Sequence, residues 1–411
     1  MSTSIWLPGR DEPLVIPEPG WAASYPPPVS RRVFAAAHVA AAPSPAADGT
    51  AVDSTAVART TAARTTADGT TVDAVIDWDS TLAFREHLWA HGFGVAEAMD
   101  TSQRGMGLSW EQARELIARS AERAAARRRA GAFAGLACGA GTDQLADGQA
   151  RSLGAITAAY AGQLAFVESA GAQVILMASR AMAATARGPR DYLEVYGELL
   201  RQASRPVILH WLGEAFDPAL RGYWGGASFE EAAGTVLELI DRAGGQVDGV
   251  KLSVLDAAHE EWLRCRLPAG VRLYTGDDFN YADLIRGPGP HSDALLGVFA
   301  AITAPAAAAL QALDAGDLAG YDAAMAPTVP LGRAIFEAPT YYYKTGVAFL
   351  AWLNGLQPHF RMLGGLERQR SVSHLIRVFE LAATARALID PGLAAERMTT
   401  LLDRTATTEH R

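Results

Sequence analysis

Eight short apolar runs, each long enough for one β-strand, alternate along the chain with stretches that have the apolar spacing of amphipathic helices. Continuously apolar strands of this kind are typical of a parallel sheet that is buried on both faces. Eight such units predict a closed (β/α)8 barrel, and the main alternative is an open doubly wound sheet. No glycine-rich dinucleotide fingerprint follows the first run, which counts against that alternative. The runs lie at residues 32–42, 94–99, 133–139, 173–178, 206–211, 247–254, 271–275 and 294–301.

The composition along the chain predicts an arm, a barrel and a helical region. Residues 1–30 are rich in proline and predict an extended N-terminal arm without a core of its own. Residues 31–304 are assigned to the barrel, which a low-complexity segment of Ala, Thr, Asp, Gly and Val interrupts at 43–75. Residues 305–411 have helical patterns, and we expect this C-terminal region to pack on the barrel as an appendage.

Capping residues mark the starts of the first two helices. Asp79 or Ser80 is expected to cap a helix that ends at His91. Ser109 followed by Gln112 has the pattern of a capping box, and this second helix is expected to end in the basic run 127–129. Both helices then lie between consecutive strand-length runs, as the barrel requires.

The charge balance excludes several classes of partner. Lys plus Arg total 36 against 45 Asp plus Glu, and a formal net charge of -9 implies no basic face for nucleic acid or an anionic membrane. No apolar run approaches the roughly 18 residues that a membrane span requires. The N-terminus lacks the basic start and apolar region of a secretory signal, and Cys138 and Cys265 are too few for a disulfide framework or a zinc cluster. These features predict a soluble, cytoplasmic protein of the size of an enzyme.

Polar side chains crowd the predicted carboxyl ends of the strands, while the strand interiors stay apolar. In a barrel of this kind the active site lies at that end. The residues there are His38, Glu97, Asp100, Thr101, Ser102, Asp143, Ser179, Arg180, His210, Glu214, Lys251, Ser253, Asp256, Asp277 and Asp278.

Lys251 differs from the other candidates because it lies within its strand. Lysine occurs only at Lys251 and Lys344 in a chain rich in arginine, and arginine cannot supply a primary amine that loses its proton. A lysine in a buried strand must find an anion or lose its charge. Desolvation lowers the pKa of an amine and supplies the neutral nucleophile that attacks a ketone or aldehyde. Lys251 is therefore either a Schiff-base lysine or a structural lysine paired with Asp256 or Asp277.

Segments around Lys251 resemble motifs of the dihydrodipicolinate synthase and N-acetylneuraminate lyase superfamily of Schiff-base aldolases. They occur in the family's order: 99–103 is similar to the Gly-Thr-Thr-Gly-Glu-like loop after the second strand, 208–213 to the Ile-Leu-Tyr-Asn-Val-Pro-like fifth strand, 249–251 to the Gly-Ile-Lys sixth strand, and 275–278 to the Ser-Gly-Asp-Asp seventh strand. The resemblance covers residues 85–310, and 344–346 resembles the family's helical C-terminal end. The chain looks most like a divergent branch with an N-terminal extension.

The resemblance implies a substrate and the roles of three residues. Lys251 forms an imine, and Thr101 with Ser102 holds the carboxylate of a keto acid through hydroxyl and backbone N–H groups. The covalent imine needs neither a metal nor an organic cofactor. The implied partner is a small-molecule keto acid or keto-sugar, and the implied assembly is a homo-oligomer.

Two departures from the family pattern direct attention to His210. The family's proton-relaying tyrosine after the fourth strand has no counterpart in 177–180, and Tyr-Asn-Val-Pro of the fifth strand becomes His-Trp-Leu-Gly at 210–213. Dihydrodipicolinate synthesis itself is therefore not expected. An imidazole suits general acid–base work, so His210 either replaces the relay or satisfies a backbone carbonyl. Glu214 either orients His210 or caps a following turn.

Four further polar residues are candidates for substrate binding. Ser179 and Arg180 follow the fourth strand, and Arg180 either binds a second carboxylate or a phosphate or forms a surface ion pair. Asp277 and Asp278 follow the seventh strand and either hold the amine of Lys251 or cap the next helix.

The leading hypothesis is a class I lyase, of the aldolase or dehydratase type, that acts on a 2-keto acid or keto-sugar through an imine on Lys251. A second hypothesis is a metal-dependent sugar isomerase or epimerase. Its ligands would come from Glu97, His210, Glu214, Asp256, His259 and Asp277. A third hypothesis is a non-catalytic barrel that binds a ligand.

Overall fold

The computed structural model describes residues 3–43, 64–65, 71–72, 74–100, 102–145, 152–287 and 289–409. Most of the low-complexity segment expected at 43–75 lies outside the described residues, and so does Thr101. The chain divides into two compact units. The barrel unit consists of Arg31–Ala37 and Phe93–Leu296, and the helical unit consists of Met1–Ser30, His38–Gly92 and Gly297–Arg411.

The eight apolar runs form the eight strands of one closed barrel, so the predicted (β/α)8 fold is confirmed. All strand pairs are parallel, and the last strand pairs with the first to close the barrel. The strands are mostly apolar because helices cover the outer face and side chains fill the interior. In barrel order they are β3 (Val33–Ala36), β8 (Gly94–Glu97), β9 (Leu136–Ala140), β10 (Gln173–Leu176), β11 (Val207–Leu212), β12 (Val247–Ser253), β13 (Arg272–Thr275) and β14 (Asp293–Leu296).

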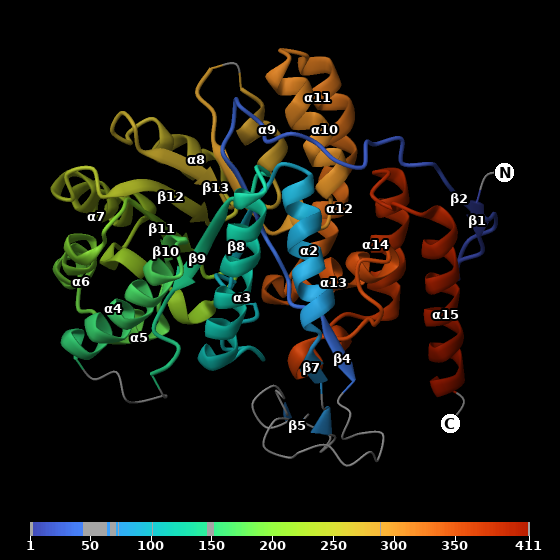
Figure 1. Ribbon diagram of the computed structural model, residues 1–411, viewed down its shortest axis with the longest axis horizontal. Helices are drawn as coiled ribbons and strands as arrows, with labels where there is room; N and C mark the ends of the chain where they lie inside the picture. Colours follow the sequence, from blue (N-terminus) through green and yellow to red (C-terminus); the bar gives the residue numbers. More distant parts are fainter. Residues whose placement is uncertain are drawn as a thin grey trace. The chain divides into compact units, whose positions relative to one another are not determined.

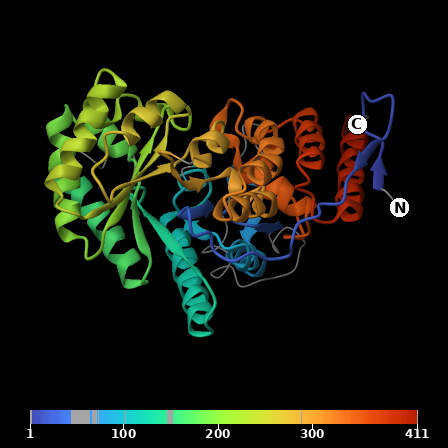
Figure 2. The ribbon, with the colours of Figure 1, turned by 90° about the horizontal axis from the view of Figure 1, so that it is seen from above.

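Helices surround the strands of the barrel unit (Figures 1 and 2). The capping box expected at Ser109 and Gln112 is present, and it begins the first helix of this unit. The helices are α3 (Trp110–Arg129), α4 (Leu153–Ser169), α5 (Arg180–Thr185), α6 (Pro189–Gln202), α7 (Phe229–Arg242), α8 (Ala257–Arg264) and α9 (Tyr281–Arg286), with 3-10 turns η2 (Pro218–Leu220) and η3 (Tyr223–Gly225) after β11.

Alternate residues of the strands fill the barrel interior. A buried cluster joins inward-facing side chains from strands around the barrel, among them Phe34, Ile175, Ile208, Tyr274 and Leu295. Because side chains alternate between the two faces of a strand, Ile208 fixes which residues of β11 face inward. The residue two positions after it, His210, therefore also points into the barrel.

Charged side chains close the amino-terminal end of the barrel. Asp248 at the start of β12 accepts hydrogen bonds from Arg32 (3.2 Å), Arg272 (2.9 Å) and the hydroxyl of Tyr274 (2.6 Å). Asp293 at the start of β14 accepts from the backbone N–H of Arg32 (2.6 Å). These contacts link the first strand to the last three, and residues at this end of a barrel serve stability.

The helical unit begins with a hairpin, although an arm without a core was expected. β1 (Thr3–Ile5) and β2 (Leu14–Ile16) pair antiparallel, and Ile5 and Ile16 are buried because the hairpin packs against the last two helices of the unit. A second antiparallel pair, β4 (Ala41–Pro43) with β7 (Ala74–Ile76), precedes α2 (Trp78–Ala90). β5 (Arg64–Thr65) pairs with β6 (Thr71–Val72).

Helix α2 is capped by a different residue from those expected. The carboxylate of Asp77, and not Asp79 or Ser80, accepts the backbone N–H of Ser80 at 3.0 Å. Asp77 caps the helix because its backbone is extended and it directly precedes the first helical residue, whereas Asp79 and Ser80 are already within the first turn.

The remaining helices of the helical unit follow residue 302 in close succession. No helix of the described residues is long and apolar enough to cross a membrane. The helices are α10 (Thr303–Asp314), α11 (Leu318–Met325), α12 (Val329–Ile335), α13 (Lys344–Leu353), α14 (Val372–Thr384) and α15 (Pro391–Glu409), with short 3-10 turns η4 (Val298–Ala300), η5 (Ala326–Thr328), η6 (Thr340–Tyr342) and η7 (Leu363–Arg368).

A buried carboxyl group links two strands of the barrel unit. Thr275 Oγ1 and Ser292 Oγ donate hydrogen bonds to Glu260 of α8 at 2.9 and 2.6 Å. Thr275 ends β13 and Ser292 precedes β14, so Glu260 ties these strands to α8. Burial raises the pKa of Glu260 to about 7.

Replacing Glu260 with glutamine is expected to flatten the pH dependence of stability between about pH 4.5 and pH 7. The folded-state pKa lies above the ordinary value, so the neutral carboxyl stabilises the fold below about pH 4.5. This contribution, on the order of 3 kcal/mol, is lost as the pH rises through 7. Urea unfolding at several pH values measures it, with the exposed neighbour Glu261→Gln as control. If the free energy of unfolding depended on pH equally in Glu260→Gln and in the wild type, the raised pKa of Glu260 would be contradicted.

Candidate active site

Lys251 and His210 lie side by side near the carboxyl end of the barrel. Lys251 of β12 is in register with His210 of β11 on one side and with Tyr274 of β13 on the other. Residues that are in register on neighbouring parallel strands point to the same face of the sheet. Neighbouring strands lie about 4.8 Å apart. His210 and Tyr274 both point inward, so Lys251 does as well. The structure therefore brings together two of the three residues predicted to carry the catalysis, Lys251 and His210, but not Glu214.

The side chain of Lys251 is enclosed, with an exposed fraction of 8%. Its Nζ lies 3.8 Å from the sulfur of Met99, just after β8. Gly276 leaves the space that the lysine occupies: a Cβ at this position would lie 3.0 Å from Lys251 Cε and 2.8 Å from Leu252 O, and would collide with Ser253 Oγ. The glycine of the 275–278 motif is thus required by close packing around the lysine.

The imidazole of His210 is buried and neutral. Its exposed fraction is 2%, and neither ring nitrogen has a hydrogen-bond partner among the described residues. Burial, and secondly the positive charge of Lys251, lowers the pKa of His210 well below its ordinary value. The ring therefore keeps one N–H donor and one acceptor nitrogen across the physiological pH range. The expected alternative, a histidine that satisfies a backbone carbonyl, does not occur in the described structure.

The turn after β8 carries a second polar group without a partner in the described chain. The backbone N–H groups of Gln103 and Arg104 donate to Asp100 O at 3.0 and 2.8 Å and form the turn. Ser102 is 2% exposed, and its hydroxyl has no hydrogen-bond partner among the described residues. Ser102 follows Met99, the neighbour of Lys251, by three positions.

Arg104 fixes the backbone at this end of the barrel and was not found from the sequence. It donates to Ala98 O and Gly139 O, both at 3.0 Å, and forms a buried ion pair with Asp143. Burial alone would raise the pKa of Asp143, but the charge and hydrogen bonds of Arg104 lower it. In a chain rich in arginine, a single arginine in a loop carries no signal that would distinguish it.

Ser179 belongs to a network of buried hydroxyl groups. Its Oγ lies 2.6 Å from Thr142 Oγ1 and accepts the N–H of Met182 at 3.0 Å, which begins α5. Its own backbone N–H donates to the hydroxyl of Tyr223 at 3.0 Å, and Tyr223 is in turn 2.7 Å from the hydroxyl of Tyr196. These contacts hold the segment after β10 in place.

Two of the predicted residues lie at the surface. Arg180 forms an ion pair with Asp217 at 2.6 Å, and its side chain is 57% exposed. Glu214 pairs with Arg221 at 2.6 Å and is 55% exposed. Since His210 has no partner in the described chain, the expected contact between Glu214 and His210 is absent. The reason is the direction of the chain after β11, which carries Glu214 out toward Arg221.

Asp277 and Asp278 are both buried after β13. The carboxylate of Asp277 accepts the backbone N–H groups of Phe279 (2.8 Å) and Asn280 (3.0 Å) and the side-chain amide of Asn280 (2.8 Å). Asp277 therefore orders the turn that leads into α9, but it does not cap this helix as one interpretation predicted, because the N-cap residue is Asn280 and α9 has no side-chain cap.

The residues proposed as metal ligands are dispersed in the described part of the chain, where no group of three or more His, Cys, Asp or Glu side chains could hold a metal ion. Glu97 accepts a hydrogen bond from Ser120 at 2.7 Å, and Asp256 lies 3.5 Å from His259. What the site offers instead is a primary amine beside an imidazole that can both donate and accept a proton.

A family model, described as "Protein of unknown function (DUF993)", matches residues 12–406. No curated protein sequence matches the chain. Solved structures, in contrast, match this chain over most of the length of each matched structure. Their sequences are only distantly similar to that of this chain.

Three of these structures illustrate the similarity. Dihydrodipicolinate synthase from Aquifex aeolicus is 12% identical with a TM-score of 0.59, and the match covers 87% of this chain and 99% of that one. Dihydrodipicolinate synthase from Cyanidioschyzon merolae, with lysine bound, is 13% identical with a TM-score of 0.59 and the same coverage. A prophage protein of the dihydrodipicolinic acid synthase family from E. coli K12, in complex with pyruvate, is 14% identical with a TM-score of 0.60, over 86% and 99% of the two chains. The chain thus belongs to the family described as "Protein of unknown function (DUF993)", and its fold is that of the dihydrodipicolinate synthases, as the motifs predicted.

Proposed function

We propose that the chain is a class I lyase that forms an imine between Lys251 and the carbonyl carbon of a 2-keto acid or keto-sugar. The observation that carries the proposal is the enclosed amine of Lys251, which points into the barrel beside the neutral and unpartnered imidazole of His210 in the described structure. The carboxyl end of the strands is where barrel enzymes hold their active sites. The complex of the similar E. coli protein with pyruvate, a 2-keto acid, supports this class of substrate.

The chemistry begins with the lone pair of Lys251 Nζ. It adds to the carbonyl carbon, and a proton moves from nitrogen to the carbonyl oxygen to give a carbinolamine. A second proton joins that hydroxyl, which leaves as water while the lone pair of the nitrogen forms a protonated C=N bond to Lys251. The protonated imine withdraws electrons from the neighbouring carbon, so that a C–C bond to it can break or a proton can leave. Addition of water to the imine releases the product and restores the amine.

Each of these steps moves a proton, and His210, in register with Lys251 on the adjacent strand, is proposed to carry it. As a neutral ring it accepts the proton released by the amine and returns it to the departing oxygen. Ser102, with its free hydroxyl in the described structure, supplies a hydrogen bond to the substrate carboxylate, and Thr101, which precedes it in the sequence, is proposed to assist. Dihydrodipicolinate synthesis itself stays outside the proposal because the chain departs from the family pattern at 177–180 and 210–213.

Borohydride trapping tests the imine directly. The full-length protein is incubated with a panel of 2-keto acids and keto-sugars, reduced, and digested with trypsin. A reduced adduct on Lys251 blocks cleavage there, so the uncut peptide 243–264 with the added mass is the expected product. Lys344, the other lysine, is the internal control and should stay unmodified. No adduct with any compound, or adducts only at Lys344 or the amino terminus, would refute the proposal and favour a non-catalytic barrel.

Replacing His210 with asparagine is expected to lower kcat by about 10²- to 10⁴-fold while Lys251 can still be trapped. Burial holds the pKa of His210 well below its ordinary value, so the wild-type pH–rate profile should have no inflection near pH 6.5. Added imidazole should restore part of the lost rate. The exposed loop residue His291 provides the control, since His291→Asn should behave as the wild type. An unchanged kcat in His210→Asn would exclude the histidine as proton carrier.

A further inference from the structure

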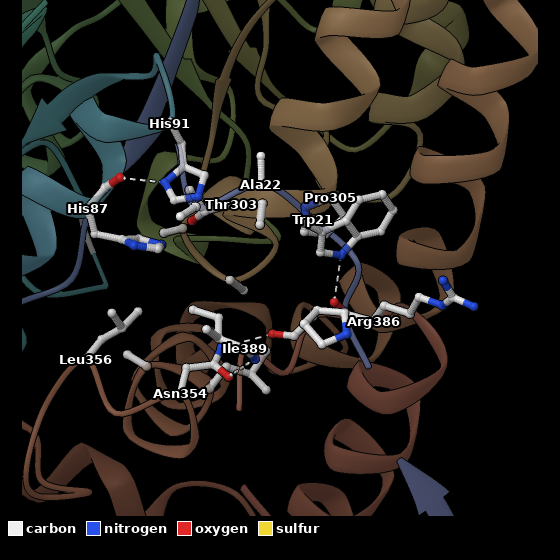
Figure 3. A pocket seen from close by; sticks show the side chains of 18 residues that line it. Trp21, Ala22, His87, His91, Thr303, Pro305, Asn354, Leu356, Arg386 and Ile389 are labelled. Carbon is white, nitrogen blue, oxygen red and sulfur yellow. Dashed lines mark hydrogen bonds between the residues drawn. The ribbon is translucent and has the colours of Figure 1, made fainter. Parts of the chain in front are cut away.

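The helical unit contains a pocket of about 330 Å³, remote in sequence from Lys251 and His210. It is drawn in Figure 3. Segments 19–23, 300–305, 350–356 and 386–389 line it together with His87 and His91 from the last turn of α2. All of these residues belong to the helical unit. Most of the lining is aliphatic or aromatic, which is typical of small-molecule sites.

Hydrogen bonds between lining residues hold the walls of the pocket in place. Trp21 Nε1 donates to Arg386 O at 2.8 Å. Asn354 Nδ2 donates to Ala387 O and its Oδ1 accepts the N–H of Ile389, both at 2.9 Å. Trp21 and Asn354 therefore use these polar atoms on the backbone, and the apolar part of the indole remains to line the pocket. Arg386 is held at a φ of 52°, a conformation that a non-glycine residue adopts only when its surroundings require it.

His87 and His91 supply the unsatisfied polar atoms of the pocket. Figure 3 shows both rings at one wall, and their centroids are 4.4 Å apart. His91 Nδ1 donates to His87 O at 2.8 Å, so the other ring nitrogen, Nε2, is an acceptor. Within the described chain, His91 Nε2 and both ring nitrogens of His87 form no hydrogen bond.

Burial lowers the pKa of both rings, and that of His87 falls to about 3. Both rings are thus neutral near pH 7. Among the described residues, no aspartate or glutamate lines the pocket, and Arg386 is the one lining residue with a permanent charge. A ligand needs no positive charge here, but it must offer a hydrogen-bond donor to His91 Nε2.

The volume limits the size of the ligand. An apolar cavity of about 150 Å³ holds one benzene molecule, so this pocket has room for roughly a dozen non-hydrogen atoms. The indole of Trp21 offers a flat apolar face, and the alanines at 300, 301, 304 and 351 leave space beside it. A flat ring system with one hydroxyl group fits these limits.

We propose that this pocket is a second ligand site that binds a small hydroxylated aromatic compound of the phenol class. The ring lies against Trp21, and the hydroxyl donates to His91 Nε2. The site is independent of the imine chemistry proposed for Lys251.

Isothermal titration calorimetry of the full-length protein with 2-naphthol tests the site. One molecule should bind with a dissociation constant on the order of 10⁻⁵ M. The methyl ether, 2-methoxynaphthalene, has the same rings but cannot donate, and should bind at least about tenfold more weakly. His91→Phe should weaken 2-naphthol about tenfold and leave the ether unchanged, while the exposed His359→Phe should change neither.

Ala351→Phe, which fills the pocket, should abolish saturable binding. Absence of saturable 2-naphthol binding to the wild type would overturn the proposal. Equal affinity of the wild type for the two compounds would also overturn it, even if no variant folds. Borohydride trapping at Lys251 is unaffected by these outcomes, so failure here is distinguishable from failure of the lyase proposal.

Discussion

Replacing Lys251 with arginine is expected to lower kcat/KM by about 10³-fold or more and to abolish borohydride trapping. A guanidinium group stays protonated in proteins and cannot act as the amine nucleophile. Turnover of whichever keto compound traps in the wild type is the measurement.

The matched control is Lys344→Arg, which alters the only other lysine of the sequence. This variant should retain trapping at Lys251. Because an arginine at 251 must fit against Met99 in an enclosed space, Lys251→Met serves as a second variant with an apolar side chain of similar length. Full activity in either Lys251 variant would exclude the imine mechanism.

Replacing Arg104 with methionine is expected to destabilise the fold by about 3 kcal/mol. The substitution leaves the carboxylate of Asp143 without its ion pair, and Ala98 O and Gly139 O without their donor. Loss of one partner of a buried pair typically costs about 3–5 kcal/mol, and partial exposure of Asp143 places this case at the lower end. Urea unfolding followed by circular dichroism measures the change.

The exposed pair of Arg119 with Glu115 on α3 provides the control for Arg104. Arg119→Met should change the free energy of unfolding by less than about 1 kcal/mol, because solvent screens that pair. If the free energy of unfolding fell by a similar amount in Arg104→Met and Arg119→Met, Arg104 would contribute no more to stability than a charge at the surface.

The barrel could be predicted from the sequence because its strands have no solvent-facing side. A strand buried on both faces leaves a continuous apolar run such as 173–178 or 206–211, and eight of these runs are hard to place in another fold. The hairpin at the N-terminus escaped prediction because β1 and β2 are only three residues each, too short for a recognisable strand pattern. Their pairing depends on packing against helices far along the chain.

The site was predictable where strand register decides it. Lys251 and His210 occupy fixed positions in adjacent strands, and their juxtaposition follows from the barrel. Strand register does not fix the neighbours of residues in the loops. Glu214 and Arg180 pair with Arg221 and Asp217 because the path of each loop, which no local pattern specifies, carries them to those partners.

Closure of the barrel has a consequence for how the chain is made. The backbone N–H of Arg32, just before β3, meets Asp293 at the start of β14, 261 residues later. At about 5–20 residues per second, the ribosome needs roughly 10–50 s to supply that partner. Throughout this interval one edge of β3 lacks β14, its neighbour in the folded barrel. An unpaired apolar strand edge promotes association with other chains. A chaperone that shields the nascent chain should therefore raise the yield of native protein more than it does for folds whose first strand pairs early.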